Sequence, residues 1–223
     1  MNVRSDRLGM LSGAAFALLL FLGINLMLGS EPDTKSKDSA ATIAQKWVAV
    51  INSSSHRNKI LVGGFIVVLS AVALIWFANT VRNRYASGGT PLMAFATLAA
   101  VGVAGAAVGP MTLVGGHTFG SEALPTDGNV MWMVGDLSMP LLLVVYGFAA
   151  AALLATFAVV ARAALPTWLL VFTWIAAVAS LASVEFFPAL LVLIYFLVIG
   201  IWGGVTAGGA RSTVSSAAAP ATA

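Results

Sequence analysis

The chain has 223 residues, of which 60% are hydrophobic and 9% charged, whereas an ordinary soluble domain carries roughly 25% charged residues. A soluble core cannot hide that much apolar surface, so we expect lipid to cover it. The formal charge of +3 comes from basic residues scattered over several polar segments, which argues against nucleic-acid binding. The absence of cysteine excludes disulfides, cysteine-ligated metals and a thiol nucleophile.

Long apolar runs alternate with short polar segments along most of the chain. A helix of about 20 residues crosses a hydrocarbon core of roughly 30 Å, and each run is long enough for that. Backbone amides in lipid must pair within their own segment, so the runs predict helices. The sequence therefore predicts an all-α membrane protein, a bundle of six transmembrane helices in one membrane domain over 1–209. The runs cover residues 8–28, 60–79, 91–114, 131–161, 165–184 and 187–207.

The first run follows two basic residues, Arg4 and Arg7, a pattern that also marks signal peptides. The run is longer than the apolar core of a usual signal peptide, and no clear Ala-x-Ala cleavage site follows it. We expect a retained membrane anchor.

The connection between the first two runs, residues 29–59, contains a short amphipathic pattern. Apolar residues at i, i+4, i+7 and i+8 predict a helix over 40–53, and Thr42 with Gln45 fits a capping box at its start. The helix could lie on the outer membrane surface or pack over the ends of the spans, and both placements stay open. A lid over a ligand is a third reading. The apolar positions are Ile43, Trp47, Val50 and Ile51.

Small residues are concentrated in the third and sixth runs. They let helix backbones approach closely, where dispersion replaces the missing hydrophobic drive between helices. We expect packing inside one bundle, with a dimer face as the alternative. Pro110 and Pro140 each remove a backbone donor and should bend their helices near the outer side. The predicted packing glycines are Gly102, Gly105, Gly109, Gly200 and Gly204.

Charges of the short connections predict the orientation. If all six runs span, segments 80–90 and 162–164 face one side and contain only arginine, whereas 115–130 and 184–188 face the other and contain only acids. Cytoplasmic loops are enriched in basic residues, so the arginine side is predicted to be cytoplasmic, with both termini on it.

Two acidic residues approach the membrane interior, Asp136 early in the fourth run and Glu185 between the last two runs. An ionisable group at lipid depth is costly and needs a partner or a proton. His117, Arg57 and Lys59 should gather on the same outer face, so one hypothesis is a proton- or cation-responsive site. The favoured interpretation is plainer: both carboxylates are helix-end groups in contact with water.

Other motifs point to no specific chemistry. His56 and His117 fall in predicted outer loops without a metal-type spacing, and the Gly-Gly pairs do not follow the strand-to-helix pattern of a phosphate loop. The sequence contains no Ser-His-Asp arrangement, P-loop or zincin motif. We therefore predict no catalytic residues, no cofactor and no metal site.

Three stretches resemble a broad group of uncharacterised six-span bacterial membrane proteins, of the type common in actinobacteria. The likeness is one of general layout over most of residues 8–207. It implies the same topology and a bacterial plasma membrane, and it implies no activity. The stretches are His56-Arg57-Asn58-Lys59-Ile60-Leu61, Trp76-Phe77 before Arg82, and Ala161-Arg162-Ala163-Ala164-Leu165-Pro166-Thr167-Trp168.

Together these features predict a multi-pass plasma-membrane protein without enzyme activity of its own. Its expected role is structural or accessory, and it would assemble in the lipid bilayer with itself or with another membrane protein. The alternative is a small transporter or channel-like protein with an outer-facing polar cavity near Asp136. Residues 210–223, rich in Ala, Ser and Thr, are predicted to form a disordered cytoplasmic tail.

Overall fold

Every regular element of the described chain is a helix, as the sequence predicts. The computed structural model describes residues 3–35, 37–85, 90–119, 129–130, 133, 140–182 and 186–209. The helices are α1 (Val3–Leu28), α2 (Ala40–Asn52), α3 (Ser54–Tyr85), α4 (Leu92–Phe119), the π-helix η1 (Leu141–Tyr146), α6 (Gly147–Ala161), α7 (Thr167–Leu181) and α8 (Phe186–Gly209).

Five helical segments have the length and composition to cross a membrane. They are Arg4–Leu28, Ser54–Tyr85, Leu92–Gly115, Leu141–Ala161 and Phe187–Thr206. The remaining apolar helix, α7, has 15 residues. At 1.5 Å per residue it is about 22 Å long, which is short of the roughly 30 Å hydrocarbon core. The chain thus has the helices of a membrane-embedded protein, and the sixth span stays a prediction.

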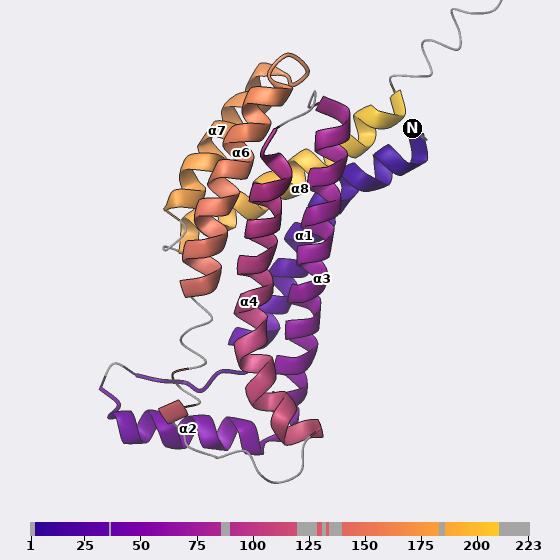
Figure 1. Cartoon of the computed structure of the whole chain (residues 1–223). Helices are drawn as coiled ribbons and strands as arrows, with labels where there is room; N and C mark the ends of the chain where they lie inside the picture. Colours follow the sequence, from indigo (N-terminus) through magenta and orange to yellow (C-terminus); the bar gives the residue numbers. More distant parts are fainter. Residues whose placement is uncertain are drawn as a thin grey trace, which may run out of the picture.

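The apolar helices form a closed ring (Figure 1). Going around it, α1 packs against α3, α3 against α4, α4 against η1 and α6, α6 against α7, α7 against α8, and α8 against α1. Glycines of α1 near its start face the end of α3, and Gly200 of α8 faces Ala14 of α1. Neighbours in the ring are therefore antiparallel, and the start of α1 and the end of α8 lie at the same end of the bundle.

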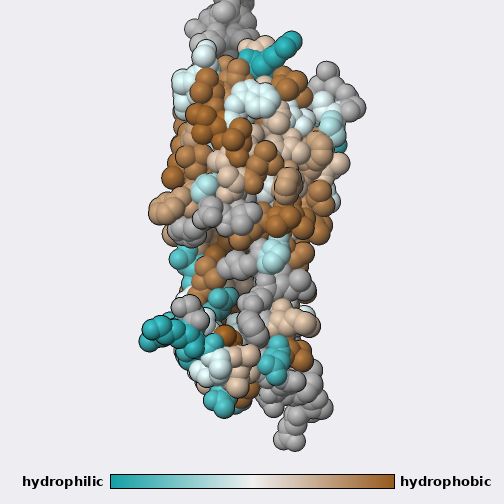
Figure 2. Space-filling view, turned by 90° about the vertical axis from the view of Figure 1, so that its left-hand side faces the viewer, coloured by the Kyte–Doolittle hydropathy of each residue, from teal (hydrophilic) through white to brown (hydrophobic). Residues whose placement is uncertain are grey.

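Charged residues separate between the two ends of this ring. The arginines of the described chain outside 29–59 lie at the end that holds the start of α1, together with Asp6. The described lysines, Arg57 and the other described acids lie at the end where α2 crosses the bundle. Figure 2 shows the hydrophilic residues gathered toward the α2 end, a smaller group at the opposite end, and a largely hydrophobic surface between them. The arginines are Arg4, Arg7, Arg82, Arg84 and Arg162.

Aromatic rings fill the bundle toward the end that holds the start of α1. Phe196 lies in edge contact with Phe16, at 4.9 Å between ring centroids, and with Phe77, at 5.7 Å. Phe157 extends the group at 6.4 Å from Phe77. All four side chains are at most 2% exposed. We call these four residues the aromatic core; because they come from α1, α3, α6 and α8, they hold opposite sides of the ring together.

The amphipathic helix α2 packs over the ends of α3 and α4, one of the two placements left open by the sequence. Trp47 and Ile51 are buried with the partly buried Leu113 of α4 packed against them, and Val50 belongs to one buried cluster with Leu61 of α3. In Figure 1, α2 lies crosswise below the long helices. Packing of this kind buries the apolar face of α2 on protein.

The start of α2 differs from the expected capping box. Ser39 is the N-cap, and its hydroxyl accepts a hydrogen bond from the backbone N–H of Thr42 at 3.2 Å. The prediction that Thr42 and Gln45 form the cap is therefore wrong. Helix α2 nevertheless begins at Ala40, as the sequence predicts, because Ser39 supplies the acceptor that the first-turn amides need.

Both prolines lie where a helix changes geometry. Pro110 is inside α4, whose last part leans away from the line of its first part in Figure 1. Pro140 precedes η1 with helical backbone angles, φ −57° and ψ −37°. The fourth predicted run, 131–161, is described as a continuous helix only from Leu141 onward, and most of 131–139 lies outside the described residues.

Candidate functional site

The residues predicted to form a polar outer site are described only in part. Asp136 and Glu185 lie outside the described residues, and His117 belongs to α4 without a described side chain. The guanidinium of Arg57 donates a hydrogen bond to the carbonyl oxygen of Ile51 at 2.6 Å, so it caps the end of α2. Lys59 is exposed. The proposed gathering of the five residues stays a prediction.

The predicted packing glycines differ in how closely a neighbour approaches. A Cβ placed on Gly102 would lie 2.6 Å from the backbone nitrogen of Tyr146, whereas one on Gly105 would lie 3.5 Å from the nearest atom of Leu141. Backbone-to-backbone contact between α4 and η1 is therefore centred on Gly102. Gly109 is half-buried, and its carbonyl accepts a hydrogen bond from the Thr112 hydroxyl at 2.7 Å.

In α8, both predicted glycines face α1. A Cβ on Gly204 would lie 2.7 Å from Cγ of Leu11, and one on Gly200 would overlap the backbone nitrogen of Ala14. Sequence reasoning missed a further pair, Gly23 of α1 and Gly63 of α3. A Cβ on either would lie 2.8 Å from the carbonyl oxygen of the other. The signal for this pair is weak, because single glycines in separate runs carry no spacing motif.

Buried hydroxyl groups in the bundle bond mainly to their own helices. Ser12, Ser30, Ser70, Thr80, Thr173 and Ser180 each donate to a backbone carbonyl three or four residues earlier, at 2.6–3.0 Å. Such bonds satisfy the hydroxyl without a water or a second helix. Among the described buried residues, these hydroxyls do not form a continuous polar path through the ring.

Two buried tyrosines differ in their hydroxyl environment. Oη of Tyr195 lies 3.0 Å from the hydroxyl oxygen of Thr173, which joins α7 to α8 by a side-chain hydrogen bond. Tyr146, at the junction of η1 and α6, is 5% exposed, and within the described chain its hydroxyl has no hydrogen-bond partner. Its ring packs at 6.1 Å from Phe16, so its environment is otherwise apolar.

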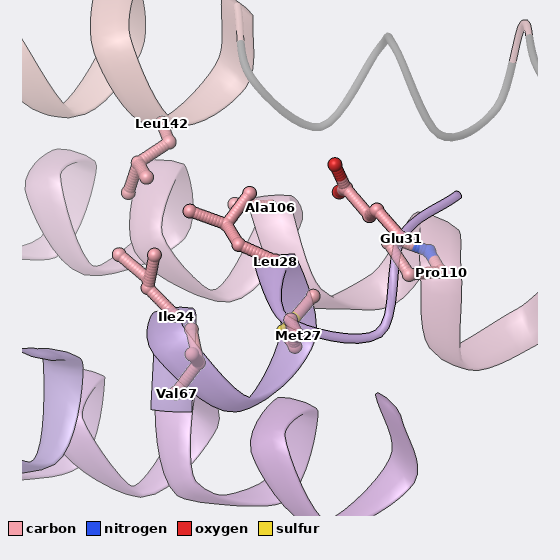
Figure 3. A pocket seen from close by; sticks show the side chains of 8 residues that line it. All are labelled: Ile24, Met27, Leu28, Glu31, Val67, Ala106, Pro110 and Leu142. Carbon is pink, nitrogen blue, oxygen red and sulfur yellow. The ribbon is translucent and has the colours of Figure 1, made fainter. Parts of the chain in front are cut away.

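A hollow opens toward the α2 end of the ring, between the last turns of α1 and the start of η1 (Figure 3). It holds about 340 Å³, counting its open side, and its apolar lining includes Ile24 and Leu28 of α1, Val67 of α3 and Leu142 of η1. Of the described residues around it, Glu31 is the one with a charge. Figure 3 places the Glu31 carboxylate at the edge of this space.

Two more hollows continue the first along α1. The second, of about 560 Å³ counting its open side, shares Ile24, Leu28 and Leu142 with the first and reaches Leu190 and Leu193 of α8. The third, of about 450 Å³, shares Phe21, Leu190 and Leu193 with the second and ends at Ala17 and Leu197. We call the three together the α1 groove: the recess along α1 from Ala17 to Leu28, bounded by η1 and α8.

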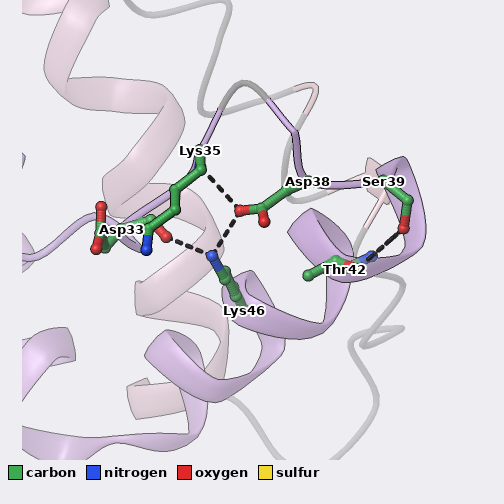
Figure 4. A network of polar contacts seen from close by, with 6 residues as sticks. All are labelled: Asp33, Lys35, Asp38, Ser39, Thr42 and Lys46. Atoms are coloured by element: carbon green, nitrogen blue, oxygen red, sulfur yellow. Dashed lines mark hydrogen bonds and ion pairs between the residues drawn. The ribbon is translucent and has the colours of Figure 1, made fainter.

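A polar network holds the segment between the α1 groove and α2 (Figure 4). The Lys46 ammonium donates to Oδ2 of Asp38 at 2.6 Å and to the carbonyl oxygen of Asp33 at 2.5 Å, and the Lys35 amide donates to Asp38 at 2.8 Å. These donors hold the pKa of the Asp38 carboxyl below its usual range, Lys46 more than Lys35. The network ties the beginning of α2 back to the chain that leaves α1.

No family model, curated protein or solved structure matches the chain. The resemblance to six-span bacterial membrane proteins therefore stays a prediction. Within the described residues, no three His, Cys, Asp or Glu side chains gather as a metal site would require. The α1 groove is a concave feature whose lining the described chain supplies, and we take it as the candidate site.

Proposed function

We propose that this protein is a multi-pass plasma-membrane protein with a structural or accessory role, without catalytic activity of its own. The observation that carries the proposal is the apolar interior of the ring. The buried serine and threonine hydroxyls described above each donate to a carbonyl of their own helix, Thr173 in addition meets the Tyr195 hydroxyl, and aromatic rings fill one half of the bundle. A protein that conducts ions or polar solutes needs polar groups along its path, whereas a protein that acts by assembly needs none.

The orientation that we propose has both termini in the cytoplasm. Its support is the arginine content of the bundle end that holds the start of α1, since basic residues favour the cytoplasmic side. Single cysteines can be introduced into this cysteine-free chain without background labelling. On intact cells, an impermeant thiol reagent should label a cysteine at Asp38 and leave one at Arg84 unlabelled. Labelling at Arg84 alone would reverse the orientation.

Assembly is the part of the proposal that decides the role. Two differently tagged copies of the chain, expressed together and solubilised in a mild detergent, should be recovered with each other or with another membrane protein. Mass spectrometry of the purified material identifies the partner. A chain recovered alone, with cross-linking in intact cells also giving a single-chain species, would contradict the accessory role.

A flux measurement tests transport through an outer site at Asp136. Asn keeps the shape and hydrogen-bonding capacity of this side chain but cannot take up and release a proton near neutral pH. In reconstituted vesicles at two pH values, we expect Asp136→Asn to leave ion flux at the level of the unmodified protein. A folded Asp136→Asn protein that loses a measurable flux would overturn the accessory role and favour the transporter.

A further inference from the structure

We propose that the α1 groove is a binding site for one acyl chain of a phospholipid, taken from the membrane leaflet on the α2 side. The proposal adds a ligand site to the accessory role, and neither depends on the other. It rests on the length, lining, course and opening of the groove.

The length of the groove matches one leaflet. Along α1 it runs from Ala17 to Leu28, which is about 16 Å at 1.5 Å per helical residue. Half of a hydrocarbon core is about 15 Å thick. Because α1 begins at Val3 and ends at Leu28, the groove occupies the half of this helix nearer α2. Its ends therefore fall near the bilayer midplane and near the headgroup level.

Its lining selects an apolar occupant. Among the described residues that line the three hollows, only Asn25 and Glu31 are polar. The Asn25 amide donates to the carbonyl oxygen of Phe21 at 2.7 Å, a bond within α1. Glu31 lies where the chain has left α1, at the end that would face a headgroup. The remaining surface offers an occupant only dispersion contacts.

The course of the groove favours a flexible chain over a helix from a partner. The third hollow uses Ala17, Leu18 and Phe21 of α1, whereas the first uses Ile24, Met27, Leu28 and Glu31. At 3.6 residues per turn, the lined face rotates by roughly 75° about the axis of α1 between the two. A straight helix about 10 Å wide cannot follow that turn into the ring, but an acyl chain bends at every methylene.

The groove opens sideways to lipid. Leu18, Phe21 and Ile194 line it and are 58%, 47% and 52% exposed. These residues lie on helices with the length and composition to cross a membrane, so in a bilayer their open side would face hydrocarbon and not water. A lipid chain can enter laterally without its headgroup crossing the apolar surface. An empty recess would forfeit the dispersion contacts of the lining, which an inserted chain restores.

Photocrosslinking can test this site in the full-length protein. Vesicles of phosphatidylethanolamine and phosphatidylglycerol would carry a trace of phospholipid with a diazirine in the middle of one acyl chain. After illumination, peptides that contain residues 17–28 and 189–194 should be labelled several-fold more than the exposed face of α7 around Val178. Equal labelling of all lipid-exposed faces would overturn the proposal, because ordinary surrounding lipid labels without preference.

Filling the groove should remove this preference. Ala189 lines the second hollow and is half-buried, so Ala189→Phe places a ring where the chain would lie. The matched control is Ala94→Phe, on an exposed position of α4. We expect Ala189→Phe to lower groove labelling to the α7 level and Ala94→Phe to leave it unchanged. If Ala189→Phe does not fold, Ala189→Leu serves in its place, and unchanged labelling in a folded filling variant contradicts the site.

Two further measurements distinguish the phospholipid chain from other possible occupants of the α1 groove. A photoactivatable free fatty acid that labels the groove more strongly than the phospholipid would overturn the phospholipid as ligand. A cysteine at Leu193 that forms a disulfide-linked dimer in the same vesicles, with the groove unlabelled by the phospholipid, would show that a second copy covers it. We expect neither result.

Discussion

The two halves of the helix ring are both built from apolar residues, but one half is closely packed and the other leaves a groove. Toward the start of α1, the aromatic core joins α1, α3, α6 and α8, and glycines of α8 bring its backbone against α1. Toward α2, the side chains between α1, η1 and α8 are mostly aliphatic, with Phe21 at the lipid-facing side, and they leave the α1 groove open. Apolar composition therefore does not decide whether a membrane bundle closes. Closure requires side chains large enough, or backbones close enough, to meet.

Truncating an aromatic side chain in the closely packed half, toward the start of α1, should have the largest effect on stability. Phe196→Ala removes edge contacts with Phe16 and Phe77 and leaves a cavity, at a cost of about 3 kcal/mol in the free energy of unfolding. Leu193→Ala, one turn earlier on α8, should cost clearly less because Leu193 already borders the open groove. Unfolding by denaturant in a single detergent measures both, and similar costs would remove the distinction between the halves.

Enlarging a glycine at the backbone contact between α8 and α1 should have the next largest effect on stability. Gly200→Leu forces a side chain into the backbone of Ala14, and overpacking of this kind costs about 1–3 kcal/mol. Gly105→Leu is the matched control, because Leu141 lies at ordinary contact distance and can move. Thermal unfolding in detergent should show a large loss for the first variant and a small one for the second. The reverse order would show that α4 carries the tighter contact.

The hydrogen bond between α7 and α8 should contribute less to the free energy of unfolding than either of these two apolar contacts. Thr173→Val keeps the shape but leaves the Tyr195 hydroxyl without this partner, which should cost about 1 kcal/mol. Thr206→Val is the control, because the Thr206 hydroxyl bonds to carbonyls of its own helix. A double-mutant cycle with Tyr195→Phe tests the pair, and additive changes in unfolding free energy would show that the two hydroxyls do not interact.

The smallest expected effect lies at the α2 end and depends on pH. The folded state lowers the pKa of Asp38, so the carboxylate stabilises this segment above its unfolded pKa of about 3.9. That contribution is lost as the pH falls through the lowered folded value. Hydrogen exchange of peptides over residues 33–52, divided by the intrinsic exchange rate at each pH, should therefore show less protection in acid for the unmodified protein. Asp38→Asn should show the lower protection already at neutral pH, and identical profiles would contradict the role of the network.

Much of the helical layout was predictable because a helix that lies in lipid requires a long, nearly continuous run of apolar residues in the sequence. A run such as 60–79 needs an apolar residue at nearly every position, and α3 covers it. The apolar spacing of Ile43, Trp47 and Ile51 likewise predicted α2, since one face of a short helix must meet either protein or lipid. The cap was less predictable: α2 starts at Ala40 as expected, but the capping hydroxyl belongs to Ser39 and not to Thr42.

The α1 groove could not be predicted. Leu193 lines it and Leu154 is buried in the ring, yet the sequence offers the same residue type in the same kind of run. What differs is the distance between the helices on either side, which depends on side chains from other segments. Gly102 was among the predicted packing glycines, but the sequence did not show that its approach to the Tyr146 backbone is closer than the contact of Gly105 with Leu141.

The short helix α7 has a consequence for the membrane itself. Its outward face is apolar and exposed, with Val171, Ile175 and Val178 all more than half exposed, yet it is only about 22 Å long. We predict that α7 spans the membrane, and lipid beside it would then meet an apolar surface about 8 Å shorter than a typical hydrocarbon core. Such a mismatch is relieved by thinning of the adjacent bilayer. The protein should accordingly thin the bilayer locally beside α7, gather lipids with shorter acyl chains there, and prefer thinner bilayers.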